Sequence, residues 1–285
     1  MPLRIIYNNR LVEAARARAE AVVSPVSLYG RGVFTTLAIY DRHPFLWDEH
    51  WSRLMEHAAR VRVDESELDK EVVFASLAQL IEANRMKDGR ARITLLATAD
   101  DGIWKTKRAD ERKTDLLIMT TDAHTVSEEG VALTVSPYRA NTLSPLASVK
   151  SINYLEHILA WEEARSRDFD EAVTLNERGE IVSATMANIF WVTDGKIHTP
   201  ALNTGALAGT TRARVIELSS ELSIPLVEGV YELSDLSETD EIFLTSASHG
   251  IQIVTTFDFH RYTVTVGSVA LRLHEAFRQL TIRRD

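Results

Sequence analysis

The sequence predicts an α/β (α+β) fold in two domains, on three observations. Segments with apolar residues at helical spacing alternate with short apolar runs typical of strands. The pattern has no repeated period, which argues against a solenoid or a propeller. The polar stretch at 122–130 ends in Gly130 and has no periodicity. We therefore expect a smaller N-terminal domain over 1–121, a linker over 122–130 and a larger C-terminal domain over 131–285.

Five elements are expected in the N-terminal domain. In the first of its two helices, Trp47, Leu54 and Ala58 fall on one face, and in the second Val72 and Leu77 point inward. The strands are apolar runs bounded by turn residues. The expected elements are a strand at 33–40, helices at 47–61 and 66–84, and strands at 91–98 and 116–121.

The C-terminal domain is expected to mix strands and helices in the same way. Ser151 is typical of a helix N-cap, and Ile152, Leu155 and Leu159 form an apolar stripe after it. The expected elements are strands from 131, at 171–176, at 181–192 and at 241–248, helices after 150 and 209, a strand pair near 251–264, and a C-terminal helix that buries Leu273 and Phe277.

Composition narrows the possible functions. The 285 residues include 45% hydrophobic and 26% charged residues, as in ordinary globular proteins. A net charge of −9 without a basic run argues against nucleic acid and anionic membrane as partners. The absence of cysteine excludes disulfides and thiolate sites. The N-terminal residues lack a signal-peptide apolar core, and no apolar run approaches about 18 residues, so we expect a cytoplasmic protein.

Lys150 is the first residue with a candidate chemical role. It directly precedes the expected helix, where the positive end of the helix dipole disfavours a cation. Burial and a positive potential both lower the pKa of a lysine, and a lysine that forms an imine needs a lowered pKa. The alternative is that Lys150 extends into water.

Two segments could bind an anion. In 207–212, Gly209 precedes Thr210 and Thr211 at an expected helix start, where main-chain N–H groups and hydroxyls are available. The strand at 244–250 ends in small hydroxyl residues and a glycine. Each alone is more often a capped helix start or a turn. Together with Arg53, they could bind a phosphate, and an imine lysine plus a phosphate site describes pyridoxal phosphate.

A metal site is not expected. His50 and His57 share one helix face with Arg53 between them. A zinc site needs two or three convergent ligands, and the sequence offers no partner cluster for these histidines.

Seven motifs in this order resemble the class IV (fold type IV) pyridoxal-phosphate enzymes, which comprise aminotransferases and aminodeoxychorismate lyases. The motifs cover nearly the whole chain: "YGRGVF", "DEHWSRL", "VKSINYLEHILAWEEA", "ANIFWV", "TPAL", "LAGTTR" and "EIFLTSA". The resemblance implies two domains with pyridoxal 5'-phosphate between them, a small amine or amino acid as substrate, and a homodimer in which a loop of the partner completes each site.

The resemblance also implies roles for individual residues. Lys150 would be the Schiff-base lysine, and Tyr154 would approach the ring hydroxyl of the cofactor. The phosphate would be held by Arg53, by Gly209, Thr210 and Thr211, and by the turn at Ser246 and Ala247. The substrate pocket would include Tyr29, Phe34, Thr36 and Ser248.

Three departures from the family pattern bear on the reaction. The glutamate that pairs with the pyridine nitrogen in most members falls at Ser183, and a serine cannot hold a protonated ring by charge. Glu180 cannot replace it if the strand is regular, because an offset of three points to the opposite face. The usual threonine of the phosphate turn is Ala247. The aminotransferase "F-E-T" is "F-T-T" at Phe34–Thr36, as in aminodeoxychorismate lyases, and the arginine of D-amino-acid aminotransferases falls at Ala97.

These departures leave alternatives open. In a lyase, ring aromatisation supplies driving force, so a weaker electron sink suffices, and we favour a reaction like that of aminodeoxychorismate lyase. An aminotransferase of the branched-chain type is the alternative. A third possibility is a protein that binds the cofactor with little catalysis, which the intact Lys150, Arg53 and "AGTTR" argue against. Pocket residues are also expected from the loop at 97–112.

Overall fold

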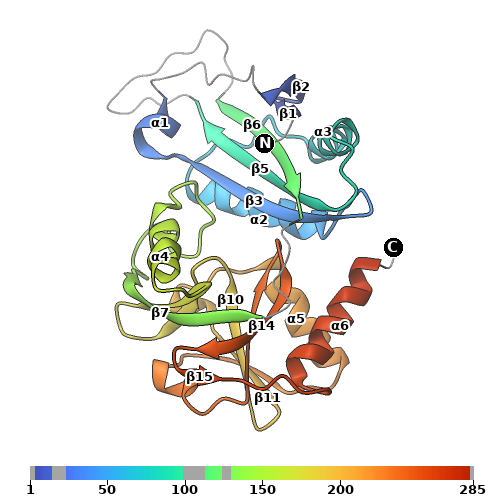
Figure 1. Ribbon diagram of the computed structural model, residues 1–285. Coiled ribbons are helices and arrows are strands. Elements are labelled where there is room, and N and C mark those ends of the chain that lie inside the picture. The colour runs from blue at the N-terminus through green and yellow to red at the C-terminus, as the bar shows by residue number, and fades with distance from the viewer. Residues whose placement is uncertain (1–3, 15–23, 99–112, 124–129, 283–285) are drawn as a thin grey trace. The chain divides into compact units, whose positions relative to one another are not determined.

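The computed structural model describes residues 4–14, 24–98, 113–123 and 130–282 (Figure 1). It divides the chain into two compact units. Unit 1 comprises Met1–His124 and Val149–Tyr154, and unit 2 comprises Thr125–Ser148 and Leu155–Asp285. The predicted linker at 122–130 overlaps the end of a strand at Asp122, and most of it lies outside the described residues. The predicted domain boundaries therefore stay a proposal.

Unit 1 is built on an antiparallel sheet of six described strands, in the order β2-β1-β6-β5-β3-β4. Its strands are β1 Arg4–Tyr7, β2 Arg10–Glu13, β3 Gly32–Tyr40, β4 His43–Pro44, β5 Gly89–Ala97 and β6 Thr114–Asp122. Its helices are α1 Pro25–Tyr29, α2 Trp47–Arg60 and α3 Lys70–Ala83.

The core of unit 1 lies between this sheet and the helices. Alternate residues of β3, Val33 and Leu37 among them, are fully buried in one cluster with Leu54 of α2 and Leu77 of α3. This alternation is the one that the sequence predicts for a strand with two different faces. It assigns Thr35 to the α2 side of β3 and Phe34 to the other side.

The second helix differs from the prediction. It begins at Lys70 rather than near 66, because Asp69 adopts an extended conformation and its side chain accepts a hydrogen bond from the N–H of Val72 at 2.9 Å. Val72 itself is 47% exposed, so its assignment to the inward face was wrong. Leu77 is fully buried, as expected.

The segment at 149–154 joins unit 1 by pairing with the start of β3. The carbonyl of Lys150 accepts a hydrogen bond from the N–H of Phe34 at 2.9 Å, and the N–H of Ile152 donates to the carbonyl of Gly32 at 3.1 Å. Ser151 forms an isolated bridge with Val33.

The predicted cap at Ser151 is therefore wrong. Helix α4 begins at Leu155, and its full span is Leu155–Ser166. The helix buries Ala160 and Ala164, whereas Leu155 is 66% exposed and Leu159 is 45% exposed. Main-chain pairing with β3 has replaced the helical conformation that the apolar spacing predicted for 151–154.

Unit 2 contains a mixed sheet of nine described strands, in the order β12-β11-β10-β13-β14-β7-β8-β9, with β15 paired to β14. Its strands are β7 Val131–Ala140, β8 Glu171–Asn176, β9 Ile181–Ala184, β10 Asn188–Thr193, β11 Lys196–Pro200, β12 Leu226–Gly229, β13 Glu241–Ser246, β14 Gly250–Phe257 and β15 His260–Arg261. Its helices besides α4 are α5 Thr210–Glu221 and α6 Val269–Ile282, with short 3-10 turns at Leu202–Thr204 and Leu233–Leu236.

The two ends of the strand order in unit 2 meet. The N–H of Ile181 in β9 donates to the carbonyl of Tyr231, just after β12, at 2.8 Å, and Glu180 bridges to Glu232. The sheet therefore curls around a core that includes Ile189, Trp191 and Leu244. On the other face of the same strands, Phe190 and Phe243 stack at 5.1 Å, and α5 and α6 pack against β13.

The expected long strand at 181–192 is two strands, which corrects the prediction. Residues 185–187 separate β9 from β10, and the pairing of β8 with β9 shifts between Thr174–Ser183 and Leu175–Ile181.

No described helix is long and apolar enough to span a membrane.

The core of unit 1 supplies a direct test of its packing. Leu77→Ala should lower the free energy of unfolding by about 2–5 kcal/mol, because the leucine is fully buried. Val72→Ala in the same helix is the matched control and should cost less than about 1 kcal/mol, because Val72 is half exposed. Urea unfolding of the three proteins measures both values, and equal losses would contradict the assigned helix faces.

Candidate active site

Lys150 is held by its main chain on two sides. Its carbonyl accepts from Phe34 in β3, and its N–H donates to Nδ1 of His57 in α2 at 3.1 Å. The side chain extends to Tyr154, where Nζ donates to the phenol oxygen at 3.4 Å. The amine also lies 4.7 Å from the ring centre of Phe34 and 5.0 Å from that of Tyr154. Two aromatic rings thus surround the amine.

The charge of Lys150 is perturbed in the direction that imine chemistry requires. Burial lowers the pKa of the amine to about 7, and Arg53 and Arg92 add to the effect. A lysine with such a pKa is partly unprotonated at neutral pH and can act as a nucleophile or a base. The predicted direction agrees, but the helix dipole is not the cause, because α4 begins five residues later.

Arg53 is buried on α2, at 8% exposure, and does not lie in water. Its Nη2 donates to the hydroxyl of Thr35 at 3.1 Å, and that hydroxyl also contacts Nδ1 of His50 at 2.7 Å. Burial lowers the pKa of Arg53 to about 10, so it stays charged at neutral pH. Burial, Arg53 and Lys150 hold the pKa of His50 well below its usual value, so His50 is neutral. Unit 1 thus fixes one guanidinium close to the amine of Lys150.

Lys150, Arg53, Phe34 and Tyr154 form a group of side chains, here called the Lys150 cluster. Arg92 also belongs to it, and the sequence analysis missed this residue. It lies in β5 opposite Thr36 of β3, so both side chains share the sheet face of Phe34. The guanidinium carbon of Arg92 is 3.5 Å from the ring centre of Phe34, and Phe34 meets Tyr154 edge-on at 5.2 Å. A charged residue in mid-strand between the buried residues Ala91 and Ile93 was the signal that could have found it.

Tyr29, another predicted pocket residue, is not joined to this cluster. It is the last residue of α1 and is 41% exposed. In the described part of the chain, no hydrogen bond or ring contact links it to Phe34 or Tyr154. The loop at 97–112, from which pocket residues were also expected, lies outside the described residues from 99 onward.

In unit 2, the start of α5 has the geometry of an anion site. Gly209 precedes the helix, and no side chain caps it. Thr210 and Thr211 are buried at 7% and 3% exposure. A Cβ at Gly209 would lie 2.1 Å from Oδ1 of Asn188, so only glycine fits there. Asn188 also fixes the preceding loop, because its Nδ2 donates to the carbonyl of Leu207 at 2.9 Å.

The turn at 246–249 lies at the end of the neighbouring strand. Asn188 of β10 pairs with Thr245 of β13, which brings the start of α5 and this turn to the same edge of the sheet. The N–H of His249 donates to Oγ of Ser246 at 3.2 Å, and Ala247 and Ser248 lie half-buried between them. Among the described residues, the buried hydroxyl of Thr245 has no hydrogen-bond partner.

Ser183 lies on β9 opposite Thr174, with its side chain away from the core inside the sheet. The register shift at Val182 places Glu180 on that same side, so β9 is not the regular strand that was expected to turn Glu180 to the opposite face. The carboxylate of Glu180 pairs instead with Arg178 at 2.6 Å and accepts from Nδ2 of Asn176 at 2.7 Å. Unit 2 therefore presents a hydroxyl at position 183, and the nearby carboxylate is committed to other groups.

Glu171 is a half-buried carboxylic acid that the sequence analysis did not single out. It accepts hydrogen bonds from the hydroxyl and the N–H of Thr185, the latter at 2.9 Å. Burial raises the pKa of Glu171 to about 7, and these hydrogen bonds oppose the rise. Thr185 opens the 185–187 segment between β9 and β10, so Glu171 fixes the approach to Asn188.

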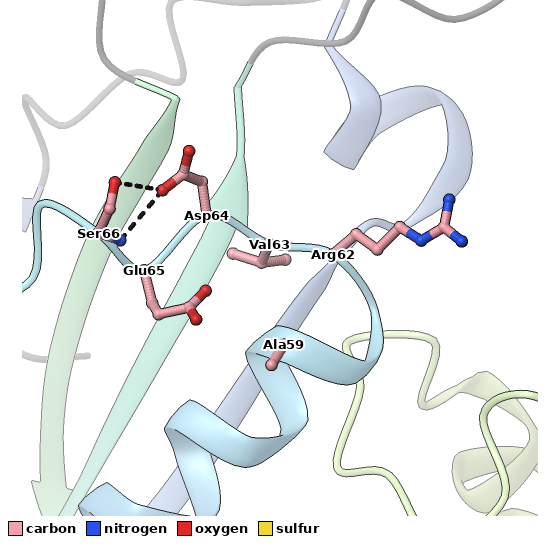
Figure 2. A pocket seen from close by; sticks show the side chains of 6 residues that line it. All are labelled: Ala59, Arg62, Val63, Asp64, Glu65 and Ser66. Carbon is pink, nitrogen blue, oxygen red and sulfur yellow. Dashed lines mark hydrogen bonds between the residues drawn. The ribbon is translucent and has the colours of Figure 1, made fainter.

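The surface hollow in Figure 2 lies elsewhere in unit 1. It has a volume of about 390 Å³ and is lined by Ala59 and by residues 62–66, just after α2. The carboxylate of Asp64 accepts hydrogen bonds from the N–H and the hydroxyl of Ser66, and the side chain of Arg62 extends in the opposite direction from these two residues. None of the predicted site residues lines this hollow.

The donor groups fit the chemistry of pyridoxal 5'-phosphate. The aldehyde of the cofactor requires an amine of low pKa, and Lys150 has one. Its phosphate requires main-chain N–H groups at a helix N-terminus, which the uncapped start of α5 offers. The partnerless hydroxyl of Thr245 lies in the strand pair next to that helix start.

Comparison with known proteins agrees with this chemistry. The profile of the family "Amino-transferase class IV" matches residues 32–257, and the chain belongs to this family of pyridoxal-phosphate enzymes. The aminodeoxychorismate lyase of Bacillus subtilis is 32% identical over 252 residues, which are 85% of this chain and 83% of the relative. The branched-chain-amino-acid aminotransferase of Escherichia coli is 29% identical over 286 residues, which are 96% of this chain and 91% of the relative.

Solved structures give the same family fold. A structure of the Escherichia coli branched-chain amino acid aminotransferase matches with a TM-score of 0.89 and 26% identity, over 99% of this chain and 95% of that chain. The branched-chain aminotransferase of Thermoproteus uzoniensis with norvaline matches with a TM-score of 0.88 and 27% identity, over 98% of this chain and 95% of that chain. The protein is thus a fold-type-IV enzyme, either an aminotransferase or an aminodeoxychorismate lyase.

The raised pKa of Glu171 predicts a pH-dependent stability. A carboxyl group whose pKa is about 7 in the folded chain and 4.5 ordinarily destabilises the fold as pH rises through that window. Glu171→Gln removes the ionisation, so the variant should gain up to about 3 kcal/mol relative to wild type between pH 4 and pH 8. Urea unfolding at both pH values measures the difference. The exposed substitution Glu221→Gln is the control, and a variant of Glu171 that tracks wild type at both values would contradict the burial.

Proposed function

We propose that the chain binds pyridoxal 5'-phosphate with Lys150 as the Schiff-base lysine. The observation that carries this proposal is the amine of the half-buried Lys150, which donates to Tyr154 at 3.4 Å and has Arg53 near enough to lower its pKa. Only an unprotonated amine attacks an aldehyde, and a pKa of about 7 keeps part of the population unprotonated at neutral pH. Other class IV relatives are pyridoxal-phosphate enzymes, which supports the same assignment.

The phosphate group would be bound by two kinds of donor. Arg53 offers a charged guanidinium whose position is fixed by Thr35. The N–H of Gly209 donates to the carbonyl of Leu207 at 2.9 Å, so Gly209 would serve by letting the phosphate approach the main chain closely. Thr210 and Thr211 would contribute main-chain N–H groups at the start of α5 and a threonine hydroxyl. The turn at 246–247 would add main-chain N–H groups, so the missing threonine hydroxyl at Ala247 is tolerated.

When bound, the cofactor withdraws electrons from the carbon that carries the substrate amino group, so a proton can leave that carbon. Lys150 would take up this proton, because a pKa of about 7 leaves part of its amine unprotonated at neutral pH. Phe34 and Tyr154 surround the amine and keep water from it. Arg92, whose guanidinium lies over the ring of Phe34, would bind a substrate carboxylate.

For the reaction, we propose cleavage of aminodeoxychorismate to p-aminobenzoate and pyruvate. The observation that supports this choice is Ser183, a hydroxyl on β9 opposite Thr174, at the position where the family resemblance leads one to expect a glutamate. A hydroxyl leaves the pyridine nitrogen unprotonated, which weakens the electron sink. Pyruvate release is aided by aromatisation of the substrate ring, so it needs a weaker sink than amino transfer does.

Amino transfer between an amino acid and a 2-oxo acid is the second candidate. The similarity to branched-chain aminotransferases extends over 96% of the chain in sequence and 99% in structure, compared with 85% for the Bacillus subtilis lyase. Branched-chain amino acids would be its substrates. We also propose that the protein is cytoplasmic and forms a homodimer in which a loop of the partner completes the site. Light scattering of the purified protein tests whether it is a dimer.

Reductive labelling tests the role of Lys150. Borohydride treatment of the protein with pyridoxal 5'-phosphate should attach the cofactor irreversibly to Lys150 and to no other lysine, as read by peptide mass mapping. Lys150→Ala should lose the label and the visible absorbance while keeping its unfolding midpoint. Lys196→Ala, at the exposed first residue of β11, is the control and should keep both. A label on any lysine other than Lys150 in the wild-type protein would overturn the assignment.

The choice of reaction is tested by two assays on the same preparation. Pyruvate release from aminodeoxychorismate should exceed amino transfer from leucine, valine or glutamate to 2-oxo acids. Ser183→Glu should accelerate the single-turnover formation of pyridoxamine phosphate from amino acids by about tenfold, because a carboxylate raises the pKa of the pyridine nitrogen.

Ser183→Ala is the matched control, since it changes the side chain without adding charge, and it should bring no such gain. Wild-type protein that transaminates rapidly and releases no pyruvate would exclude the lyase and establish the second candidate. It would also show that a hydroxyl at position 183 does not limit amino transfer.

A further inference from the structure

His57 contacts the main chain of Lys150 from the neighbouring helix. It lies in α2 one turn after Arg53 and is 3% exposed. Its Nδ1 is the acceptor of the hydrogen bond from the N–H of Lys150, at 3.1 Å. The next peptide group is fixed as well, because the carbonyl of Lys150 accepts from Phe34 in β3. The two peptide groups at Lys150 are therefore tied to two different elements.

The contact requires a neutral imidazole. Nδ1 accepts the hydrogen bond from the N–H of Lys150, so it carries no proton itself. Burial lowers the pKa of His57 to about 4, and Arg53, Arg60 and Lys150 add to the effect. Among the described residues, these three cations are the charged groups that act on the ring, from α2 and from the segment at 149–154. At neutral pH the histidine therefore stays an acceptor.

The hydrogen bond to His57 affects the position of the amine, because it helps to fix the main chain from which the side chain of Lys150 extends. Its amine reaches Tyr154 at 3.4 Å and lies in the joint field of Arg53 and Arg92. If the main chain were free on the α2 side, the side chain could turn the amine toward water. An amine in water regains the ordinary lysine pKa of about 10.4.

We propose that His57 is a positioning residue that holds the amine of Lys150 in its buried place through the main-chain hydrogen bond. The proposal rests on Lys150 being the reactive lysine, as proposed above. It assigns to His57 a role in the reactivity of another residue, beyond filling the space between α2 and the 149–154 segment.

The experiment measures the pH dependence of Lys150 reactivity in the full-length protein freed of cofactor. Trace acetylation with acetic anhydride, read by mass spectrometry of the Lys150 peptide, gives the pH midpoint of the amine. Wild type should have a midpoint near pH 7. His57→Leu, which fills a similar volume without an acceptor, should raise the midpoint by at least one pH unit. His57→Asn, whose Oδ1 can take the place of Nδ1, should restore it to within about half a unit of wild type.

Leu77→Ala is the control for a purely structural effect. It should lower the unfolding midpoint and leave the acetylation midpoint of Lys150 unchanged, because Leu77 lies in the core of unit 1 at α3. If His57→Leu does not fold, His57→Ala takes its place, since a water can satisfy the N–H of Lys150 there without anchoring it to α2.

The outcomes separate this proposal from the proposed function. A folded His57→Leu or His57→Ala protein with the wild-type midpoint would overturn the role of His57. A wild-type midpoint near that of ordinary lysines would instead remove the basis for Lys150 as the reactive lysine. A raised midpoint in the leucine variant that asparagine does not restore would also refute the hydrogen bond as the cause.

Discussion

The pairing of residues 150–152 with the start of β3 is the interaction on which the Lys150 cluster depends. Two main-chain hydrogen bonds, Phe34 to Lys150 and Ile152 to Gly32, place the lysine beside a strand whose faces differ. Alternation along β3 then sorts the contacts. Thr35 turns to α2, where it accepts from Arg53, and Phe34 turns to the other face, where it meets Arg92 and Tyr154. One strand register therefore decides which charges surround the amine.

Unit 2 relies on a comparable constraint at Asn188. This residue opens β10, pairs with Thr245 of β13, and binds the loop before α5 through the carbonyl of Leu207. The absence of a side chain at Gly209 lets the helix start approach Asn188 closely. Glu171, through Thr185, fixes the chain just before Asn188. A single asparagine thus sets where the helix start and the 246–249 turn lie with respect to each other.

The sequence predicted most elements because local periodicity decided them, as at β3 and α2. It failed where tertiary contacts decided the outcome. Residues 151–154 have apolar residues at helical spacing, but the N–H of Ile152 is hydrogen-bonded to Gly32 of β3. Helix α4 therefore begins only at Leu155. The shift in the pairing of β8 with β9 depends on the partner strand and has no local signal. In the site, Lys150, Arg53 and Phe34 came from motifs. Arg92 and His57 are visible in the sequence as a charged residue in mid-strand and a histidine on the face of Arg53, but their contacts with Phe34 and Lys150 depend on neighbours distant in sequence.

The Lys150 cluster brings three basic side chains together in unit 1, and their charges affect both binding and reactivity. Arg53 and Arg92 lower the pKa of Lys150, and burial is the largest cause of the lowered pKa at all three residues. Keeping cations in such a place costs free energy. An anionic ligand would offset that cost, because it satisfies the guanidinium groups and stabilises the state to which it binds. Binding would at the same time restore part of the proton affinity of Lys150, since an opposite charge raises the pKa of an amine.

The Lys150 cluster therefore combines two requirements that oppose each other: an amine that is unprotonated when it reacts, and a positive field strong enough to hold an anion. Fixing the amine of Lys150 through its main chain lets both be met, because the amine cannot escape to water when Arg53 and Arg92 repel its proton.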